Sequence, residues 1–181
     1  MAPTAKDEVP KDGPPKLSDF GDRIDQSTFE QILEMDDDDD RDFSKGIVYG
    51  FFEQADGTFE KMEKAMSQGD LKELSQLGHF LKGSSATLGL TKVKEACEKI
   101  QHYGARKDET GTINEPDEKV SLENIKKTLA DVKEDYTDVE TLLRRFYGED
   151  VSIRKKPASK EATTSTDELT PASKTEKEAS K

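Results

Sequence analysis

A histidine, a lysine and a glycine stand close together in residues 79–90, a segment with a helical pattern. Lys82 follows His79 by three residues and Gly83 follows it by four. Because residues three and four apart share one face of an α-helix, the imidazole would lie beside a cation and beside a position without a side chain. Neutral imidazole is a nucleophile near neutral pH. This arrangement suits accepting a phosphoryl group, offsetting its charge and admitting a large partner.

The same segment carries a stripe of leucines that predicts which side of the helix is buried. At about 100° per residue, four of them share one side: Leu74, Leu77, Leu81 and Leu88. His79, Lys82, Gly83 and Ala86 fall on the opposite side, so we expect His79 to face solvent or a partner. A surface histidine without a role is the alternative. Glycine costs a helix interior about 1 kcal/mol relative to alanine, and close approach of another protein is a reason to place one here.

Composition limits the size of the folded part. The chain has 181 residues, of which 31% are hydrophobic and 38% are charged. A chain this polar lacks the apolar residues for a core over its whole length, so we expect disorder in the proline-rich residues 1–20 and in the polar residues 149–181. Residues 21–148 are the expected domain.

Charge and apolar content narrow the classes of partner. Residues 1–20 carry a net charge of −1 and residues 149–181 carry none, which leaves −11 of the total −12 on residues 21–148. An acidic domain disfavours nucleic acid and favours a protein partner. The sequence has no apolar run that could span a membrane and no visible secretory signal. The single cysteine, Cys97, excludes an internal disulfide and fits a reducing compartment.

Hydrophobic periodicity predicts an all-α fold without strands. A short helix is expected over residues 25–34, with Ser27 as its cap. Four longer amphipathic helices are expected over residues 42–67, 70–88, 91–104 and 119–147, with Thr91 capping the fourth segment. Such helices, joined by turns, predict an antiparallel four-helix bundle that the short helix caps or flanks. The acidic run 36–40 lacks the pattern of a calcium loop and is interpreted as a solvated turn.

Several kinds of chemistry lack their motifs here. The sequence has no glycine-rich phosphate loop and no kinase signature, so we expect no ATP-dependent kinase activity. His79, His102 and Cys97 do not have zinc-site spacing, and no cofactor is expected. His102 is interpreted as an exposed polar residue. Phosphoryl transfer needs mainly positioning and charge stabilisation, which His79 and Lys82 would supply.

The sequence from about residue 25 to 147 resembles the histidine-containing phosphotransfer (HPt) family, in particular its free-standing fungal phosphorelay members. The resemblance lies in residues 79–90, in residues 34–46 and in residues 97–101. It implies that His79 is the phosphoacceptor, that Lys82 stabilises the phosphoryl group and that Gly83 keeps the approach open. Ser84 and Gln101 would orient or support the site.

The resemblance also implies partners and a setting. The donor would be the receiver domain of a hybrid sensor histidine kinase and the acceptors would be response-regulator receiver domains, each bringing its own aspartate and Mg²⁺. The chain would act as a monomeric covalent carrier in the cytoplasm and nucleus, without nucleic acid or membrane, typically in osmotic or oxidative stress signalling. Two alternatives are a non-catalytic helical adaptor and an inhibitor that docks on receivers without accepting phosphate.

A docking surface around His79 is expected from polar and apolar residues that lie off the core stripes. Its predicted members are Ile32, Met35, Ile47, Gly50, Gln54 and Phe80. Apolar residues that gather on a surface are typical of partner sites. We expect the first helix to cover Phe43 and to leave Ile47 at least partly exposed.

Overall fold

The computed structural model describes residues 13–151, and every element in that range is helical. A 3₁₀-helix, η1 (Leu17–Arg23), and a short helix, α1 (Gln26–Leu33), precede four longer helices: α2 (Asp42–Gln68), α3 (Leu71–Thr87), α4 (Thr91–Gly104) and α5 (Glu118–Phe146). The all-α fold is therefore confirmed. Within residues 13–151, no helix combines the length and apolar character that crossing a membrane requires.

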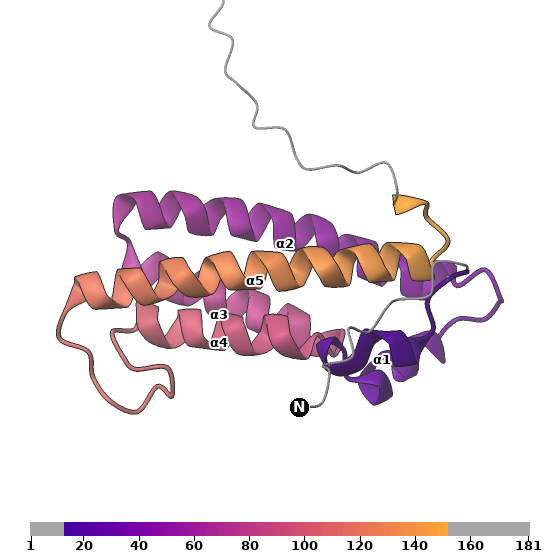
Figure 1. Ribbon diagram of the computed structural model, residues 1–181, viewed down its shortest axis with the longest axis horizontal. Helices are drawn as coiled ribbons and strands as arrows, with labels where there is room; N and C mark the ends of the chain where they lie inside the picture. The colour runs from indigo at the N-terminus through magenta and orange to yellow at the C-terminus, as the bar shows by residue number, and fades with distance from the viewer. Residues whose placement is uncertain (1–12, 152–181) are drawn as a thin grey trace, which may run out of the picture. The chain divides into compact units, whose positions relative to one another are not determined.

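The four long helices form the predicted antiparallel bundle, and η1 and α1 lie at one end of it (Figure 1). The most extensive contacts join α3 to α4, followed by those of α4 with α5 and of α2 with α3. The apolar stripes expected from periodicity fill the core, which includes Val48, Phe52, Leu74, Leu81 and Ile125. Helix α3 is therefore held by neighbours on one side and presents its other side outward.

Short connections fix the register between α2 and α3. Gly69 ends α2 in the left-handed conformation, with φ of 67°, and its N–H donates to the carbonyl oxygens of Ala65 and Met66. The next residue, Asp70, caps α3 by accepting a hydrogen bond from the N–H of Glu73 at 3.0 Å. Glycine tolerates this φ at little cost, and aspartate is a favoured N-cap. One helix therefore starts almost where the other ends.

Two predicted caps were wrong, and the acidic run has a more definite role than a solvated turn. Asp25, not Ser27, caps α1, and Leu90, not Thr91, occupies the N-cap position of α4. The hydroxyl of Thr91 instead donates to the carbonyl of Asp22 at 2.5 Å. In the acidic run, the carboxylate of Asp36 accepts from the N–H of Ser44 at 2.8 Å, and so caps the first turn of α2.

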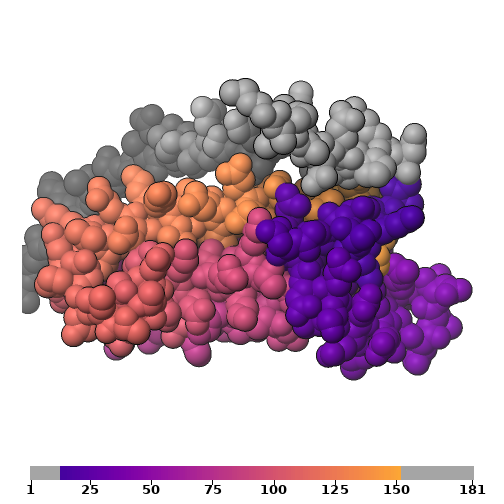
Figure 2. Space-filling model, turned by 60° about the horizontal axis from the view of Figure 1, so that its bottom comes forward, coloured from indigo at the N-terminus to yellow at the C-terminus, as the bar shows by residue number. Residues whose placement is uncertain are grey.

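The N-terminal boundary of the folded part lies before residue 20, which corrects the expectation that residues 1–20 are disordered. The side chain of Phe20 is 0% exposed. Its ring centroid lies 6.3 Å from that of Phe29 on α1 and 5.9 Å from that of Phe146 on α5. Figure 2 shows the indigo N-terminal residues covering one end of the bundle. An isolated Phe20 gave no periodic signal, so the pattern could not show this contact.

The C-terminal boundary also lies beyond the expected residue 148. The carboxylate of Glu149 lies 3.2 Å from the guanidinium of Arg144, and Tyr147 donates its hydroxyl proton to Ser44 at 2.9 Å. The first contact holds residue 149 against α5, and the second ties the end of α5 to the start of α2. The predicted disorder of residues 1–12 and 152–181 lies outside the described residues.

Replacing Phe20 by alanine tests whether the N-terminal segment is part of the folded domain. We expect Phe20→Ala to lower the free energy of unfolding by about 3 kcal/mol, because it leaves a cavity beside the rings of Phe29 and Phe146. Phe43→Ala is the control, since that side chain is 49% exposed, and its effect should stay below about 0.5 kcal/mol. Urea denaturation followed by circular dichroism measures both. Equal, small effects would show that η1 is not required for the fold.

Candidate functional site

His79 lies on the exposed side of α3, as the leucine stripe predicts. Leu74, Leu77, Leu81 and Leu88 are all buried, whereas His79, Gly83 and Ala86 are exposed. No residue among 13–151 forms a hydrogen bond with the His79 ring. The imidazole is therefore accessible to a reactant that comes from outside the chain.

Lys82 lies one turn after His79 and is tied to the neighbouring helix. Its ammonium nitrogen lies 3.4 Å from a carboxylate oxygen of Glu98 on α4. The Lys82 side chain is 24% exposed and the Glu98 side chain is 44% exposed. A cation is thus held on the same face as His79, and its counter-ion comes from α4. Sequence analysis did not identify Glu98, because a contact between helices leaves no spacing signal within either one.

Helices α3 and α4 approach each other closely beside His79, at Gly78. A Cβ atom at Gly78 would lie 2.8 Å from both the carbonyl oxygen of Cys97 and the backbone nitrogen of Gln101. One turn earlier, the hydroxyl of Ser75 donates to the Gln101 carbonyl at 2.8 Å. Only a residue without a side chain permits this contact at residue 78. It brings the backbone of Gln101 next to Gly78, the residue that precedes His79.

The two remaining predicted site residues differ in what surrounds them. A Cβ atom at Gly83 would meet nothing within 4 Å, so packing within the chain does not require a glycine there. The hydroxyl of Ser84 lies 3.4 Å from the Phe80 carbonyl of the preceding turn, which is a local helix contact and not a contact with His79. The structure thus groups His79, Lys82 and Gly83 on one face, with Gln101 on the adjacent helix. It does not bring Ser84 into contact with His79.

Gln101 on α4 carries a buried hydrogen-bond acceptor. Its side-chain oxygen is buried and has no hydrogen-bond partner among residues 13–151. Buried polar atoms are nearly always satisfied, so an unpaired one calls for an explanation. A donor brought by a ligand or by a ring nitrogen would satisfy it. This is consistent with the supporting role that the resemblance assigns to Gln101.

The predicted docking residues fall into exposed and buried groups. Met35 and Phe80 are 58% and 48% exposed, Gly50 and Gln54 are exposed, and Ile47 is partly buried as expected. Ile32 is only 8% exposed and packs in the core, which corrects its place in the docking surface. Phe43 was expected to be covered, but it is 49% exposed. The turn of α1 that buries Ile32 directs Met35 outward, and α1 leaves Phe43 uncovered.

The other histidine is engaged within the loop between α4 and α5. The Nδ1 atom of His102 lies 2.8 Å from the carbonyl oxygen of Glu109. Gly111 packs against the other side of the ring, where an added Cβ atom would lie 2.8 Å from Nε2. Both ring nitrogens therefore face the loop, which makes His102 a structural residue and leaves His79 as the accessible imidazole of residues 13–151.

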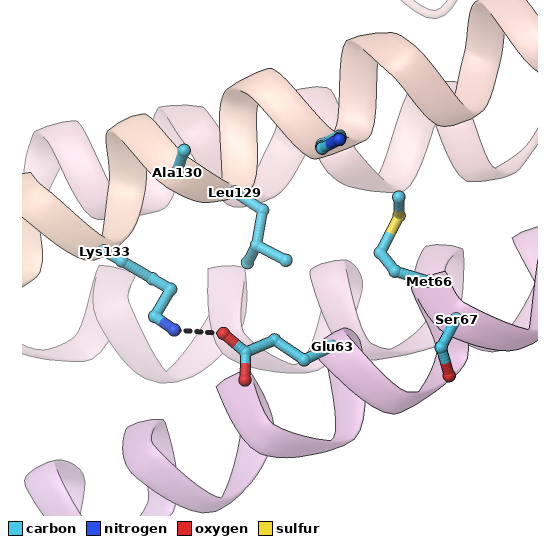
Figure 3. Close-up of a pocket in the computed structure, with 7 residues that line it drawn as sticks. Glu63, Met66, Ser67, Leu129, Ala130 and Lys133 are labelled. Atoms are coloured by element: carbon cyan, nitrogen blue, oxygen red, sulfur yellow. Dashed lines mark hydrogen bonds and ion pairs between the residues drawn. The ribbon is translucent and has the colours of Figure 1, made fainter. Parts of the chain in front are cut away.

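The buried cysteine and a groove between α2 and α5 do not compete with this face. Burial raises the pKa of the Cys97 thiol to about 12, so this group stays protonated and unreactive near neutral pH. No group of three or more metal-ligating side chains occurs in the described range. A groove of about 630 Å³ between α2 and α5 contains the Lys133–Glu63 ion pair (Figure 3), and no predicted site residue lines it.

The chain belongs to the Hpt domain family, whose pattern matches residues 47–143. It is 51% identical over 124 residues to Multistep phosphorelay regulator 1 of Schizosaccharomyces pombe, covering 68% of this chain and 42% of that protein. It is 47% identical over 89 residues to Phosphorelay intermediate protein YPD1 of Candida albicans, covering 49% of this chain and 47% of that protein. The chain therefore spans about half the length of the curated relatives it matches.

A solved structure shares the fold. The histidine phosphotransfer signaling protein Ypd1 of Saccharomyces cerevisiae, crystallised with the receiver domain of its downstream response regulator Ssk1, superposes with a TM-score of 0.60 at 34% identity. The match covers 69% of this chain and 94% of that chain. The family and fold expected from residues 79–90, 34–46 and 97–101 are therefore confirmed.

Two glycines on α3 should respond oppositely to substitution. We expect Gly78→Ala to lower the free energy of unfolding by about 2 kcal/mol, because the added methyl group forces α3 and α4 apart. Gly83→Ala should raise it by about 0.5–1 kcal/mol, since the methyl group meets open space and alanine is the better helix former. Chemical denaturation of both variants measures the difference. A stabilised Gly78→Ala variant would contradict the close approach of the two helices.

Proposed function

We propose that this protein is a phosphorelay intermediate that carries a phosphoryl group on His79 between the aspartates of receiver domains. The observation that carries the proposal is the exposed His79 imidazole with the Lys82 ammonium one turn away on a helix of the Hpt family. In a phosphoryl transfer the protein contributes mainly position and charge, which these two residues supply.

The transfer step balances without any further reactant. The lone pair of an imidazole nitrogen of His79 forms an N–P bond with the phosphoryl group of a receiver phosphoaspartate. The P–O bond to the aspartate breaks, and its electron pair returns to the carboxylate. The proton on the other ring nitrogen stays in place, so the ring carries a positive charge when the step ends. The reverse step returns the phosphoryl group to an aspartate of the next receiver.

The residues around His79 have different proposed roles in the transfer step. Lys82 places a positive charge beside the phosphoryl oxygens, which is the kind of fixed stabilisation that accelerates such transfers. Gly83 leaves the space that an approaching receiver needs, since nothing in the described chain occupies it. The role proposed for Gln101, whose backbone lies beside Gly78, is to support the ring or the phosphoryl group. The receiver would bring the aspartate and the Mg²⁺.

The proposed partners are the receiver domain of a hybrid sensor histidine kinase and the receiver domains of response regulators. Support comes from the Ypd1 co-crystal with the Ssk1 receiver domain, which shares this fold. We further propose that the relay serves osmotic stress signalling and operates in the cytoplasm and nucleus, on the basis of the family resemblance. The alternatives of a docking inhibitor and a helical adaptor both predict that the chain takes up no phosphoryl group.

Replacing His79 tests the phosphoacceptor. We expect His79→Gln to keep the wild-type melting temperature, because the side chain is exposed, and to accept no phosphoryl group from a phosphorylated receiver domain. Acid-labile, alkali-stable label on the chain is the measurement. His102→Gln is the matched control and should still be labelled. Label retained on His79→Gln would move the acceptor to His102, and an unlabelled wild-type chain would favour the inhibitor or adaptor.

Replacing Phe80 tests the docking surface. We expect Phe80→Ser to weaken receiver binding about ten-fold, because a receiver that reaches His79 must cover the adjacent phenyl ring. Phe43→Ser, farther along the surface, should have a smaller effect. Ile113→Ser is the control, since Ile113 is 67% exposed in the loop between α4 and α5. Titration calorimetry with a receiver domain measures all three affinities. An equal loss for Ile113→Ser would place the docking surface elsewhere.

A further inference from the structure

Glu98 occupies a position that the transfer step described above leaves unexplained. Its carboxylate lies 3.4 Å from the Lys82 ammonium. Among the ion pairs of residues 13–151, this one alone joins α3 to α4. The next lysine on α4, Lys99, is directed to Glu109 in the following loop at 3.4 Å. The only charged partner of Lys82 in the described chain is therefore Glu98.

A phosphoryl group on His79 would change the surroundings of both charges. Lys82 follows His79 by one helical turn, so the phosphoryl oxygens and the Glu98 carboxylate would be two anionic partners for one ammonium. The same carboxylate would also repel the phosphoryl dianion. Without the phosphoryl group, Lys82 and Glu98 neutralise each other. Glu98 thus favours the free form of His79 and disfavours the phosphorylated form.

We propose that Glu98 is a positioning residue that competes with the phosphoryl group for Lys82 and so biases the phosphoryl group toward leaving for a receiver aspartate. This inference rests on the proposed function of His79. It makes the distribution of the phosphoryl group between carrier and receiver depend on a residue that contacts neither reacting atom. Such a bias would favour release of the phosphoryl group from the carrier to the next receiver.

The size of the bias follows from the exposure of the pair. Lys82 and Glu98 are 24% and 44% exposed, so solvent weakens their attraction, and such pairs contribute little to stability. The corresponding change in the transfer equilibrium is roughly two- to five-fold. Because dissolved salt screens partly exposed charges, the effect should shrink as the ionic strength rises.

The decisive experiment measures the equilibrium distribution of label between the full chain and a purified receiver domain that has been phosphorylated on its aspartate in the presence of Mg²⁺. We expect Glu98→Gln to shift the distribution roughly two- to five-fold toward phosphohistidine. Glu95→Gln is the matched control, because it removes the same charge one turn earlier on α4, where the side chain is exposed and makes no contact with Lys82. It should leave the distribution nearly unchanged.

Two further measurements separate competition for Lys82 from other effects. In a Lys82→Gln background, the shift caused by Glu98→Gln should become smaller, because the shared cation is gone. In the wild-type background, the shift should decline with added salt. Melting temperatures of Glu98→Gln and Glu95→Gln should match the wild type, which excludes a general loss of structure.

The outcomes distinguish this inference from the proposed function. No label on the wild-type chain would contradict the proposed function, and this inference with it. Label on the wild-type chain, with Glu98→Gln and Glu95→Gln behaving alike, would contradict the inference alone. A Glu98→Gln shift toward the receiver would also overturn it, because Glu98 would then hold Lys82 in place for the phosphoryl group instead of competing for it.

Discussion

The close contact between α3 and α4 is the constraint on which the rest of the site depends. Helices usually pack with their axes 8–10 Å apart, and side chains at the contact set the distance. Here Gly78 packs against the backbone of Cys97 and Gln101, and Gly104 packs in the same way against Leu71 and Ser75. With a glycine from each helix at the interface, side chains of α4 reach the face of α3 that carries His79. Glu98 can pair with Lys82 only because of this approach.

The electrostatics of the face follow from that geometry. A histidine, a lysine and a glutamate lie on two helices that the described chain leaves open to a partner, and the described residues hold no cluster of metal ligands. In the proposed transfer, the cation that would stabilise charge at His79 is Lys82, which is already paired with Glu98. If the chain is the proposed carrier, a stronger charge at this site would favour retention of the phosphoryl group over its release. One partly exposed ion pair suits this purpose, because it changes the free-energy difference between free and phosphorylated His79 only slightly.

Sequence pattern predicted the helices and the face of α3, but not the contacts between helices. The leucine stripe of α3 placed His79 and Lys82 outward, since burial repeats with the period of the helix. The pattern did not point to Glu98 or Gly78, because each contacts a residue on the other helix. Contacts between α3 and α4 have no fixed spacing in the sequence. Ile32 was assigned to the surface for a similar reason: the short helix α1 has too few turns to show which of its apolar residues meets the bundle. Phe20 gave no signal, because it is a single aromatic residue in a polar segment.

The N-terminal segment links the docking surface to the bundle by way of the turn between α3 and α4. The Asp25 N–H donates to the Gly89 carbonyl at 2.7 Å, and a Cβ atom at Gly89 would collide with the Asp25 carbonyl at 2.9 Å. The rings of Phe20, Phe29 and Phe146 hold the same end from the other side, with 6.0 Å between the last two centroids. Helix α1 is therefore fixed against both the end of α3 and the end of α5. Met35, which follows the C-cap of α1, is 58% exposed, whereas Ile32 is 8% exposed, so the attachment of α1 goes with which apolar side chains at this end a partner can reach.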